Sequence, residues 1–559
     1  MVKLDTRPLT HLPSAIIQMR AMILMLAATA CGEPTPQTVD TTYVDGDAFR
    51  LTIQPIAPSG QEGMFDEIDA MQLVVTQANG DVSTHVLGRS STASPTNESV
   101  PPLDEATLTL LGRAGSAVVF HGRTTPLSIS EGEHDLSIFV ARNGTAVLLD
   151  ELPSARAMSP MVAAGDGRFF MFGGSDNGVR ENQSYTSILR LDLSASSEDR
   201  EPSSIESTLP PPDFGGGWMG HTATLIEGQS NHAGEILIAG GTSYMLSATG
   251  GAIMGQGYAS AVAHRFDPDS EELTAIDDLN HARFGHSAVS NHRGEIAVIG
   301  GFRQSDSGIQ MAEFIEIYDP DSDSWSTRTD PLTAGTVFHG AARLGNQGIL
   351  VCGGVNAQFE YTATCQLVTP NGVVEAAADL PAPLVWPHMV TLPSGAVLLT
   401  GGLDASAEEF DSFWSPTLDA QSNAWIYQAG SWRETEPMRT ARAMHSATVL
   451  PGGRVLIAGG VSGIDASVEP TDIQYSGLLF DHTHALACAE IFDPESESFS
   501  AVDPCGAGTA SATLPERTLL PAMASDADYG ALIAGGIGVD AGNSVSGVIL
   551  FHPTYSGLE

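Results

Sequence analysis

The chain has 559 residues, which is long enough for more than one domain with its own apolar core. Glycine (59 residues) and proline (33) are abundant and aromatic residues make up only 6%, a composition typical of turn-rich β-structure. The net charge of −43 argues against nucleic acid and anionic membrane surfaces as partners, and it favours high solubility.

Residues 1–30 have the pattern of a cleaved export signal. Basic residues precede an apolar run, residues 21–28, that is too short to cross a bilayer as a helix. The run ends in Ala28-Thr29-Ala30, directly before Cys31. This stretch resembles a bacterial lipoprotein signal, although that family prefers Leu where Ala28 stands. The resemblance implies cleavage before Cys31 and lipidation of its thiol; the alternative is an ordinary secretory signal.

Either signal predicts export, and residues 31–40 then form a short tether. Gly32 rather than Asp follows the cysteine, which by the same resemblance favours the outer membrane over the inner membrane. We therefore expect a lipid-anchored protein at the outer membrane or cell surface of a Gram-negative bacterium. Its contact with the membrane is expected only through the lipid.

Residues 41–143 contain short alternating runs of apolar and polar residues, separated by turn signals such as Asn79-Gly80 and Glu131-Gly132. This pattern predicts a small β-sandwich, and we expect it to be immunoglobulin-like. The segment contains no catalytic motif, so a spacer or adhesion role is expected.

The stretch VLPGGRVLIAGG, residues 449–460, represents a unit that recurs through residues 144–559. A turn leads into four or five apolar residues and then into a Gly pair. Seven such pairs end at Gly174, Gly241, Gly301, Gly354, Gly402, Gly460 and Gly536. Units of about 50 residues that differ only in loop length are typical of β-propeller blades.

Each unit also carries flanking signals. Arg442 and His445 precede the first strand of the sixth unit, and in the third unit an Asp319-Pro320 turn leads to Trp325. The set resembles the kelch repeat, over about residues 155–553. The resemblance implies an all-β protein with a seven-bladed kelch-type propeller of the galactose oxidase-like superfamily.

Counting strands predicts how the ring closes. The seventh unit has room for only three strands before the chain ends, and residues 146–149 form a spare apolar strand before the first unit. We expect this strand to pair with residues 548–551, because the pairing removes two exposed sheet edges.

The cysteines fit an exported protein. Cys352 and Cys365 lie on adjacent strands of the fourth unit, and Cys488 and Cys505 lie in the sixth. We expect disulfides Cys352–Cys365 and Cys488–Cys505. A metal–thiolate site is the alternative, but no CxxC spacing supports it.

Histidines and arginines recur before the first strand of most units, at His221, His286, His339, His388 and His445 and at Arg156, Arg283, Arg442 and Arg517. Ser159 and Leu520 replace the histidine in units one and seven. We interpret the repeated histidines and arginines as architectural, because each blade needs them, and we expect no metal site. Residues of a single binding site must instead break the repeat. The long loops between the second and third strands of units two, five and six do so, and they lie on one face. Candidate binding residues there are Tyr244, Tyr258, Phe410, Phe413, Trp414, Tyr475, Phe480 and His482.

These features predict a monomer, without cofactor, that binds a protein or glycan ligand at the cell surface without catalysis. The alternative is a carbohydrate-active enzyme, since kelch-type propellers include copper radical oxidases and sialic acid epimerases. The oxidase resemblance implies a Cys–Tyr crosslink with Tyr and His copper ligands. The expected disulfides argue against that crosslink.

Overall fold

The computed structural model describes residues 42–45, 49–58, 60–87, 102–124, 126–176, 184–194, 201–210, 217–242, 259–305, 308–328, 330, 332–405, 418–464, 485–502, 514, 517–538 and 545–554. No helix among these residues is long and apolar enough to cross a membrane.

The N-terminal part forms two β-sheets that share one apolar core. The smaller sheet has the order β1 (Thr42–Asp45), β2 (Phe49–Ile56), β8 (Gly132–Phe139), and β2 and β8 are parallel. The larger sheet has the order β4 (Val82–Leu87), β3 (Ala70–Thr76), β5 (Leu103–Ala114), β6 (Ala117–Arg123), β9 (Ala141–Arg142), with β7 (Leu127–Ile129) also paired to β5. Buried side chains from both sheets, such as Leu51 and Phe120, meet in the core, as in a β-sandwich. Its immunoglobulin-like character stays a prediction.

The rest of the chain forms seven four-stranded antiparallel sheets, the number that the repeats predict. From the innermost strand outward, the first three are β11 (Met161–Ala163), β12 (Arg168–Phe172), β13 (Ser187–Asp192), β14 (Ser203–Thr208); β15 (Thr222–Leu225), β16 (Ile236–Ala239), β17 (Ala263–Asp267), β18 (Glu272–Ala275); and β20 (Ser287–Ser290), β21 (Ile296–Ile299), β24 (Ile315–Asp319), β25 (Ser324–Arg328).

The fourth to sixth sheets are β26 (Gly340–Leu344), β27 (Gly348–Cys352), β28 (Cys365–Val368), β29 (Val374–Ala376); β31 (His388–Thr391), β32 (Val397–Thr400), β35 (Ala424–Gln428), β36 (Ser431–Glu434); and β37 (Ser446–Val449), β38 (Val455–Ala458), β40 (Ala489–Asp493), β41 (Ser498–Ala501). The seventh is β43 (Ala522–Asp526), β44 (Gly530–Ala534), β46 (Val548–His552), β10 (Thr145–Leu148). Short added pairs join β19 (Arg283–Phe284), β22 (Phe302–Ser305) and β23 (Gly308–Met311); β30 (Leu384–Val385) and β33 (Leu403–Asp404); β34 (Leu418–Asp419) and β39 (Gly463–Ile464); and β42 (Thr518–Leu519) and β45 (Ile537–Gly538).

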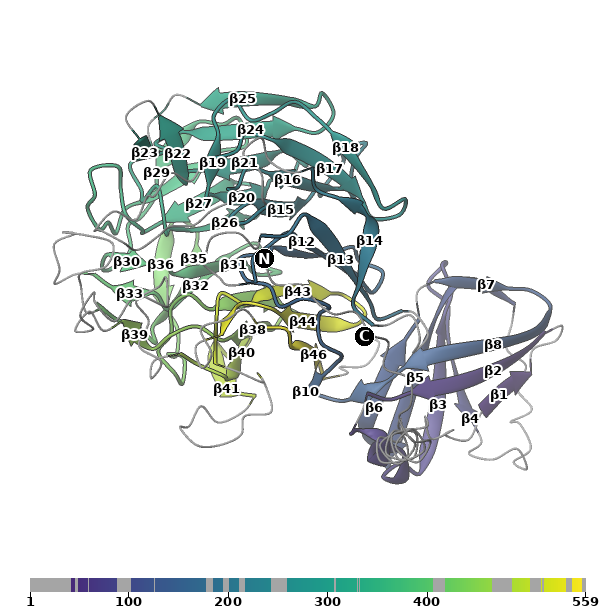
Figure 1. Cartoon of the computed structure of the whole chain (residues 1–559). Helices are drawn as coiled ribbons and strands as arrows, with labels where there is room; N and C mark the ends of the chain where they lie inside the picture. Colours follow the sequence, from purple (N-terminus) through teal and green to yellow (C-terminus); the bar gives the residue numbers. More distant parts are fainter. Residues whose placement is uncertain are drawn as a thin grey trace, which may run out of the picture.

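The sheets stand around one axis, and their innermost strands contact one another in a closed ring from β11 through β43 (Figure 1). The predicted closing strand is confirmed: β10 pairs with β46 in the seventh sheet, with Ala146 opposite Phe551. The fold is thus a β-propeller, and we call its sheets blades one to seven in chain order.

The repeated Gly pair joins each blade to the next. The N–H of its second glycine donates to a backbone carbonyl of the following blade at 2.7–3.0 Å, and Gly536 of blade seven closes the ring by donating to Arg156 of blade one. Both glycines of every pair have positive φ. A Cβ on Gly301 would lie 2.7 Å from the Phe284 carbonyl oxygen. Only glycine allows both the conformation and this approach.

The register corrects three positions of the predicted repeat. The second glycines of blades two, three, four and six lie against His221, His286, His339 and His445, but that of blade five lies against Pro387. His388 therefore stands one position later than the other histidines. In blade seven Pro521, not Leu520, occupies the histidine position, and Thr518, not Arg517, occupies the arginine position. The missed cue is Pro387, which shifts the histidine by one residue.

The sandwich packs directly on blade seven. Phe139 and Ala141 belong to the same core cluster as Leu550. The imidazole rings of His121 and His552 stack with their centroids 3.9 Å apart. Arg123 and Asp528 form an ion pair beside them. The predicted domain boundary near residue 143 stays a prediction, and the contacts across it are apolar as well as polar.

Candidate binding site in the axial channel

A cavity of about 1130 Å³ lies on the propeller axis. Residues of the innermost strands β15, β20, β26, β31 and β37, with Ser525 of β43, line it. Each of these strands pairs with only one neighbour within its blade, so its other backbone edge is left free of ladder partners. The walls of the cavity are therefore sheet edges.

The cavity opens at the face that carries the turns between the first and second strands. Turn residues at its mouth include Glu227 of blade two, His292 of blade three, Asn346 and Gln347 of blade four, and Ser394 of blade five. These turns differ in sequence between blades, because the interblade hydrogen bonds lie at the other end of the strands. The mouth thus combines charged, amide and hydroxyl groups from four blades.

One ion pair crosses blade three at the mouth. Arg343 Nη1, on β26, lies 2.8 Å from Glu227 Oε2, which follows β15. The Arg343 side chain is 31% exposed and that of Glu227 46% exposed, so the pair is partly hydrated. The hydroxyl of Thr391 donates to the Arg343 carbonyl at 2.7 Å and fixes the backbone of blade four against blade five. Arg343 is therefore held in position by its two neighbours along the wall.

Hydroxyl and aliphatic side chains alternate deeper in the cavity. The hydroxyl-bearing residues are Thr224, Ser290, Thr391, Thr448 and Ser525, and the aliphatic ones include Leu225, Val289, Val390 and Val449. No aromatic side chain is among the described residues that line the cavity. The site offers hydrogen bonds and small apolar patches, but no stacking platform.

The opposite end of the axis is closed by an apolar cluster that draws residues from all around the ring, including Ala157, Val337, Val385 and Ala443. At this end each blade has, besides its Gly pair, a residue in the left-handed region: Met158, Gly220, Gly285, Phe338, Trp386, Met444 and Leu520. A bulky residue with positive φ is strained. Its recurrence in five blades shows that the ring geometry imposes it, so the strain is architectural.

The repeated histidines are buried between blades and are absent from the cavity lining. Burial lowers the pKa of His221 to about 3 and that of His339 to about 4. Burial, and then the charge of Arg283, lowers the pKa of His286 far below its usual value. Threonine hydroxyls lie 3.0 Å from His286 Nε2 and 2.9 Å from His445 Nε2. Neutral imidazoles that serve packing and hydrogen bonding fit the architectural interpretation.

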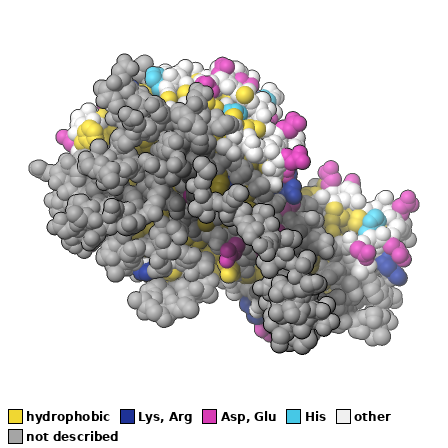
Figure 2. Space-filling view, viewed as in Figure 1, with side chains coloured by type: hydrophobic (Ala, Val, Ile, Leu, Met, Phe, Trp, Pro, Cys, Tyr) yellow, Lys and Arg dark blue, Asp and Glu magenta, His cyan; other side chains and the backbone are white. Residues whose placement is uncertain are grey.

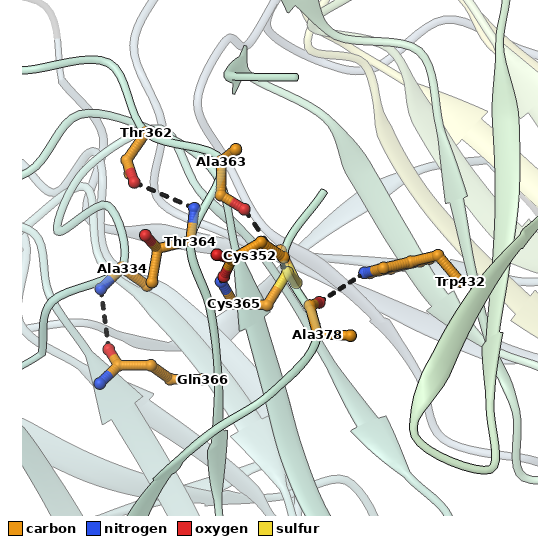
Figure 3. The surroundings of a disulfide bond; sticks show 10 residues. Ala334, Cys352, Thr362, Ala363, Thr364, Cys365, Gln366, Ala378 and Trp432 are labelled. Carbon is orange, nitrogen blue, oxygen red and sulfur yellow. Dashed lines mark hydrogen bonds between the residues drawn. A yellow bond between two sulfur atoms is a disulfide. The ribbon is translucent and has the colours of Figure 1, made fainter. Parts of the chain in front are cut away.

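Disulfide chemistry is present as expected in blade four. Cys352 and Cys365 are directly paired across β27 and β28 and form a disulfide (Figure 3). Gln366, next in the strand, accepts hydrogen bonds from the Thr333 and Ala334 amides. Cys488 is also disulfide-bonded. Its predicted partner Cys505, like Cys31, lies outside the described residues, so that pairing stays a prediction.

The predicted binding residues cannot be placed. Tyr244, Tyr258, Phe410, Phe413, Trp414, Tyr475, Phe480 and His482 all lie outside the described residues. The cavity opens at the opposite face from Ala239 and Ala263, the ends of β16 and β17 between which Tyr244 and Tyr258 lie in the sequence. Sequence reasoning missed it because sheet edges have no side-chain signature; the differing turns between first and second strands were the available cue.

Among solved structures, the chain is similar to a fungal alcohol oxidase of the AA5 family in complex with copper, at 17% identity and a TM-score of 0.50, over 73% of this chain and 76% of the oxidase. It is also similar to YjhT, at 14% identity and a TM-score of 0.43, over 63% of this chain and 98% of YjhT. No protein-family model and no curated protein matches the chain. The likeness to the oxidase supports the β-propeller fold that the strand pairing shows.

The comparison contradicts the prediction that the chain is not an enzyme, because an oxidase has the same fold. The described residues do not, however, fit the copper group of such an oxidase. Cys352, Cys365 and Cys488 are in disulfides and are not available for a crosslink to tyrosine. No group of three His, Cys, Asp or Glu side chains among the described residues is placed to hold a metal ion. We derive no copper-dependent step for them.

Proposed function

We propose that this protein binds a small hydroxyl-bearing ligand of the glycan type in the axial channel. The observation that carries the proposal is the cavity itself, whose volume of about 1130 Å³ is slightly larger than the roughly 300–1,000 Å³ usual for small-ligand sites. Such a concave site favours a small molecule or the end of a glycan chain over a folded protein, which needs a broad surface.

The lining supports the same ligand class. Hydroxyl side chains such as Thr224 and Ser525 offer hydrogen bonds, and Val289 and Val390 offer contacts for the C–H faces of a sugar ring. The amides of Asn346 and Gln347 at the mouth add donors and acceptors.

Binding and turnover can be tested together on the mature chain produced without its lipid. A glycan array, followed by calorimetry on the best binders, identifies the ligand, and NMR of the recovered ligand reports any chemical change. Asn346→Ala combined with Gln347→Ala should weaken binding about tenfold, because two or three hydrogen bonds at the mouth are lost. Gln428→Ala, at the exposed end of β35 in blade five, is the matched control and should leave affinity unchanged. Equal affinity of the double variant and the control would refute binding at the channel mouth.

We also propose that the ligand is met outside the cell, at a membrane surface to which the chain is anchored through Cys31. The lipoprotein-like stretch before Cys31 supports this location. Full-length protein should partition into detergent and incorporate labelled fatty acid, and Cys31→Ser should abolish both. A soluble product with an ordinary cleaved N-terminus would contradict the anchor.

A further inference from the structure

The backbone edges around the channel set the chemistry of any ligand that the proposed function requires. An unpaired strand edge presents N–H donors and C=O acceptors in alternation. Innermost strands from six blades contribute to the cavity wall, so donors and acceptors are interspersed on all sides. A hydroxyl group can donate or accept and therefore fits every position of such a wall. A carboxylate only accepts, and it meets repulsion wherever a carbonyl points inward.

The charged side chains strengthen this selection. Arg343 is the only arginine among the described residues that line the cavity. Its guanidinium is already paired with the Glu227 carboxylate at 2.8 Å. An anionic ligand would have to displace Glu227, and the carboxylate would then remain beside the incoming charge. The net charge of −43 opposes the approach of an anion further. Figure 2 shows acidic side chains at the outer edges of the described surface.

We infer that the channel selects neutral polyhydroxylated compounds over acidic ones, and that Glu227 is the selectivity residue because it neutralises Arg343. The class of ligand in this inference rests on the proposed function. The discrimination against acidic ligands rests on the ion pair between Glu227 and Arg343. Discrimination of this kind places a repulsive group against the wrong ligand as well as suitable contacts for the right one.

The test uses matched probes: di- to tetrasaccharides of glucose, galactose and mannose, each with its uronate counterpart. Wild-type protein should bind the neutral member of at least one pair, and the uronate at least about fivefold more weakly. Glu227→Gln keeps the shape of the side chain and frees Arg343, so it should change the neutral-to-uronate ratio by about two- to fivefold toward the uronate, the range for a hydrated ion pair.

Two controls separate the local effect from the global charge. Glu272→Gln removes the same charge from an exposed strand on the outside of blade two and should leave the ratio unchanged. Glu227→Gln combined with Arg343→Gln should return the ratio to the wild-type value. Melting temperatures of all variants should agree within a few degrees, because the substituted side chains are partly or fully exposed.

The outcomes are distinct for the two proposals. If wild-type protein binds uronates as well as neutral sugars, or if Glu227→Gln leaves the ratio unchanged, the selectivity inference is overturned. If no sugar binds, the proposed function fails. The role of Glu227 is then tested separately, with acetate as the anionic probe. Arg343 resonances should shift with acetate in Glu227→Gln and not in wild-type protein; equal shifts in both would overturn that role.

Discussion

Blade four lacks the buried ion pair that blades three and six contain. Replacing the ion pair of blade six by the corresponding uncharged residues of blade four therefore measures what the two charges contribute to stability. In blade six Arg442 Nη2 lies 2.8 Å from Glu490 Oε1, and both side chains are at most 1% exposed. Blade four has Thr336 at the arginine position and Gln366 at the glutamate position, as the shared glycine contact and strand register show. The same architecture is therefore built with and without the charges.

The cost of each substitution follows from the groups left behind. Arg442→Thr leaves Glu490 buried with only the Arg439 and Thr440 amides as donors, at 2.6 and 3.0 Å. It also removes donors to the Gly459 and Cys488 carbonyls. Breaking a buried pair from one side costs about 3–5 kcal/mol. Glu490→Gln keeps an acceptor for the two amides but leaves the buried charge of Arg442 without its counter-ion, with a cost in the same range.

The double variant, which copies blade four, should cost only about 1–2 kcal/mol, because no buried charge is left. The coupling energy of the cycle is then at least about 3 kcal/mol. Urea unfolding monitored by tryptophan fluorescence and circular dichroism measures it, with unchanged m-values as the check on two-state behaviour. If the cost of the double variant equalled the sum of the two single-variant costs, the view that each charge is needed only to neutralise the other would be refuted.

Two further outcomes follow from the buried histidines and the cysteines. Burial lowers the pKa of His121 to about 2 and that of His552 to about 4, below 6.5, so the neutral forms stabilise the fold. This contribution is complete above about pH 6.5 and is lost as the pH falls toward 4 for His552 and toward 2 for His121. In urea titrations between pH 7.5 and 4.5, His552→Gln should therefore reduce the slope by about 1.4 kcal/mol per pH unit, and an unchanged slope would contradict its burial as a neutral group. Cys352→Ser with Cys365→Ser should cost about 2–3 kcal/mol, since the disulfide closes a short loop, and non-reducing peptide maps should pair Cys488 with Cys505 and not with another cysteine.

The features that sequence predicted best are those that every blade needs. The Gly pair could be recognised because each copy must donate to the next blade and leave room for a carbonyl or an imidazole, so the requirement recurs seven times. The closing strand followed from counting, and Cys352–Cys365 from the pairing of adjacent strands. The shifted His388 shows the limit of pattern alignment, because Pro387 takes its place at the glycine contact.

The candidate site could not be predicted in the same way. Its walls are backbone edges, and the ion pair between Glu227 and Arg343 joins residues 116 positions apart in blades that are not neighbours in the ring. Neither feature leaves a local motif. Sequence reasoning favoured aromatic residues on long loops, and those residues lie outside the described part of the chain.

The two ends of the propeller axis differ for a physical reason that bears on where a ligand can bind. At one end the interblade hydrogen bonds of the Gly pairs, the left-handed residues and the apolar cluster fix nearly every backbone position. A substitution there disturbs two blades at once. At the other end the turns between first and second strands do not share one repeated hydrogen bond. Neighbouring turns touch through pairs such as Gly228–Gly294 and Gly345–Gly395, and other side chains of these turns differ from blade to blade. Glu227, His292 and Asn346 occupy three such turns around one cavity. Among the described residues, side chains that differ from blade to blade gather around the cavity at this end, which is where we place the ligand.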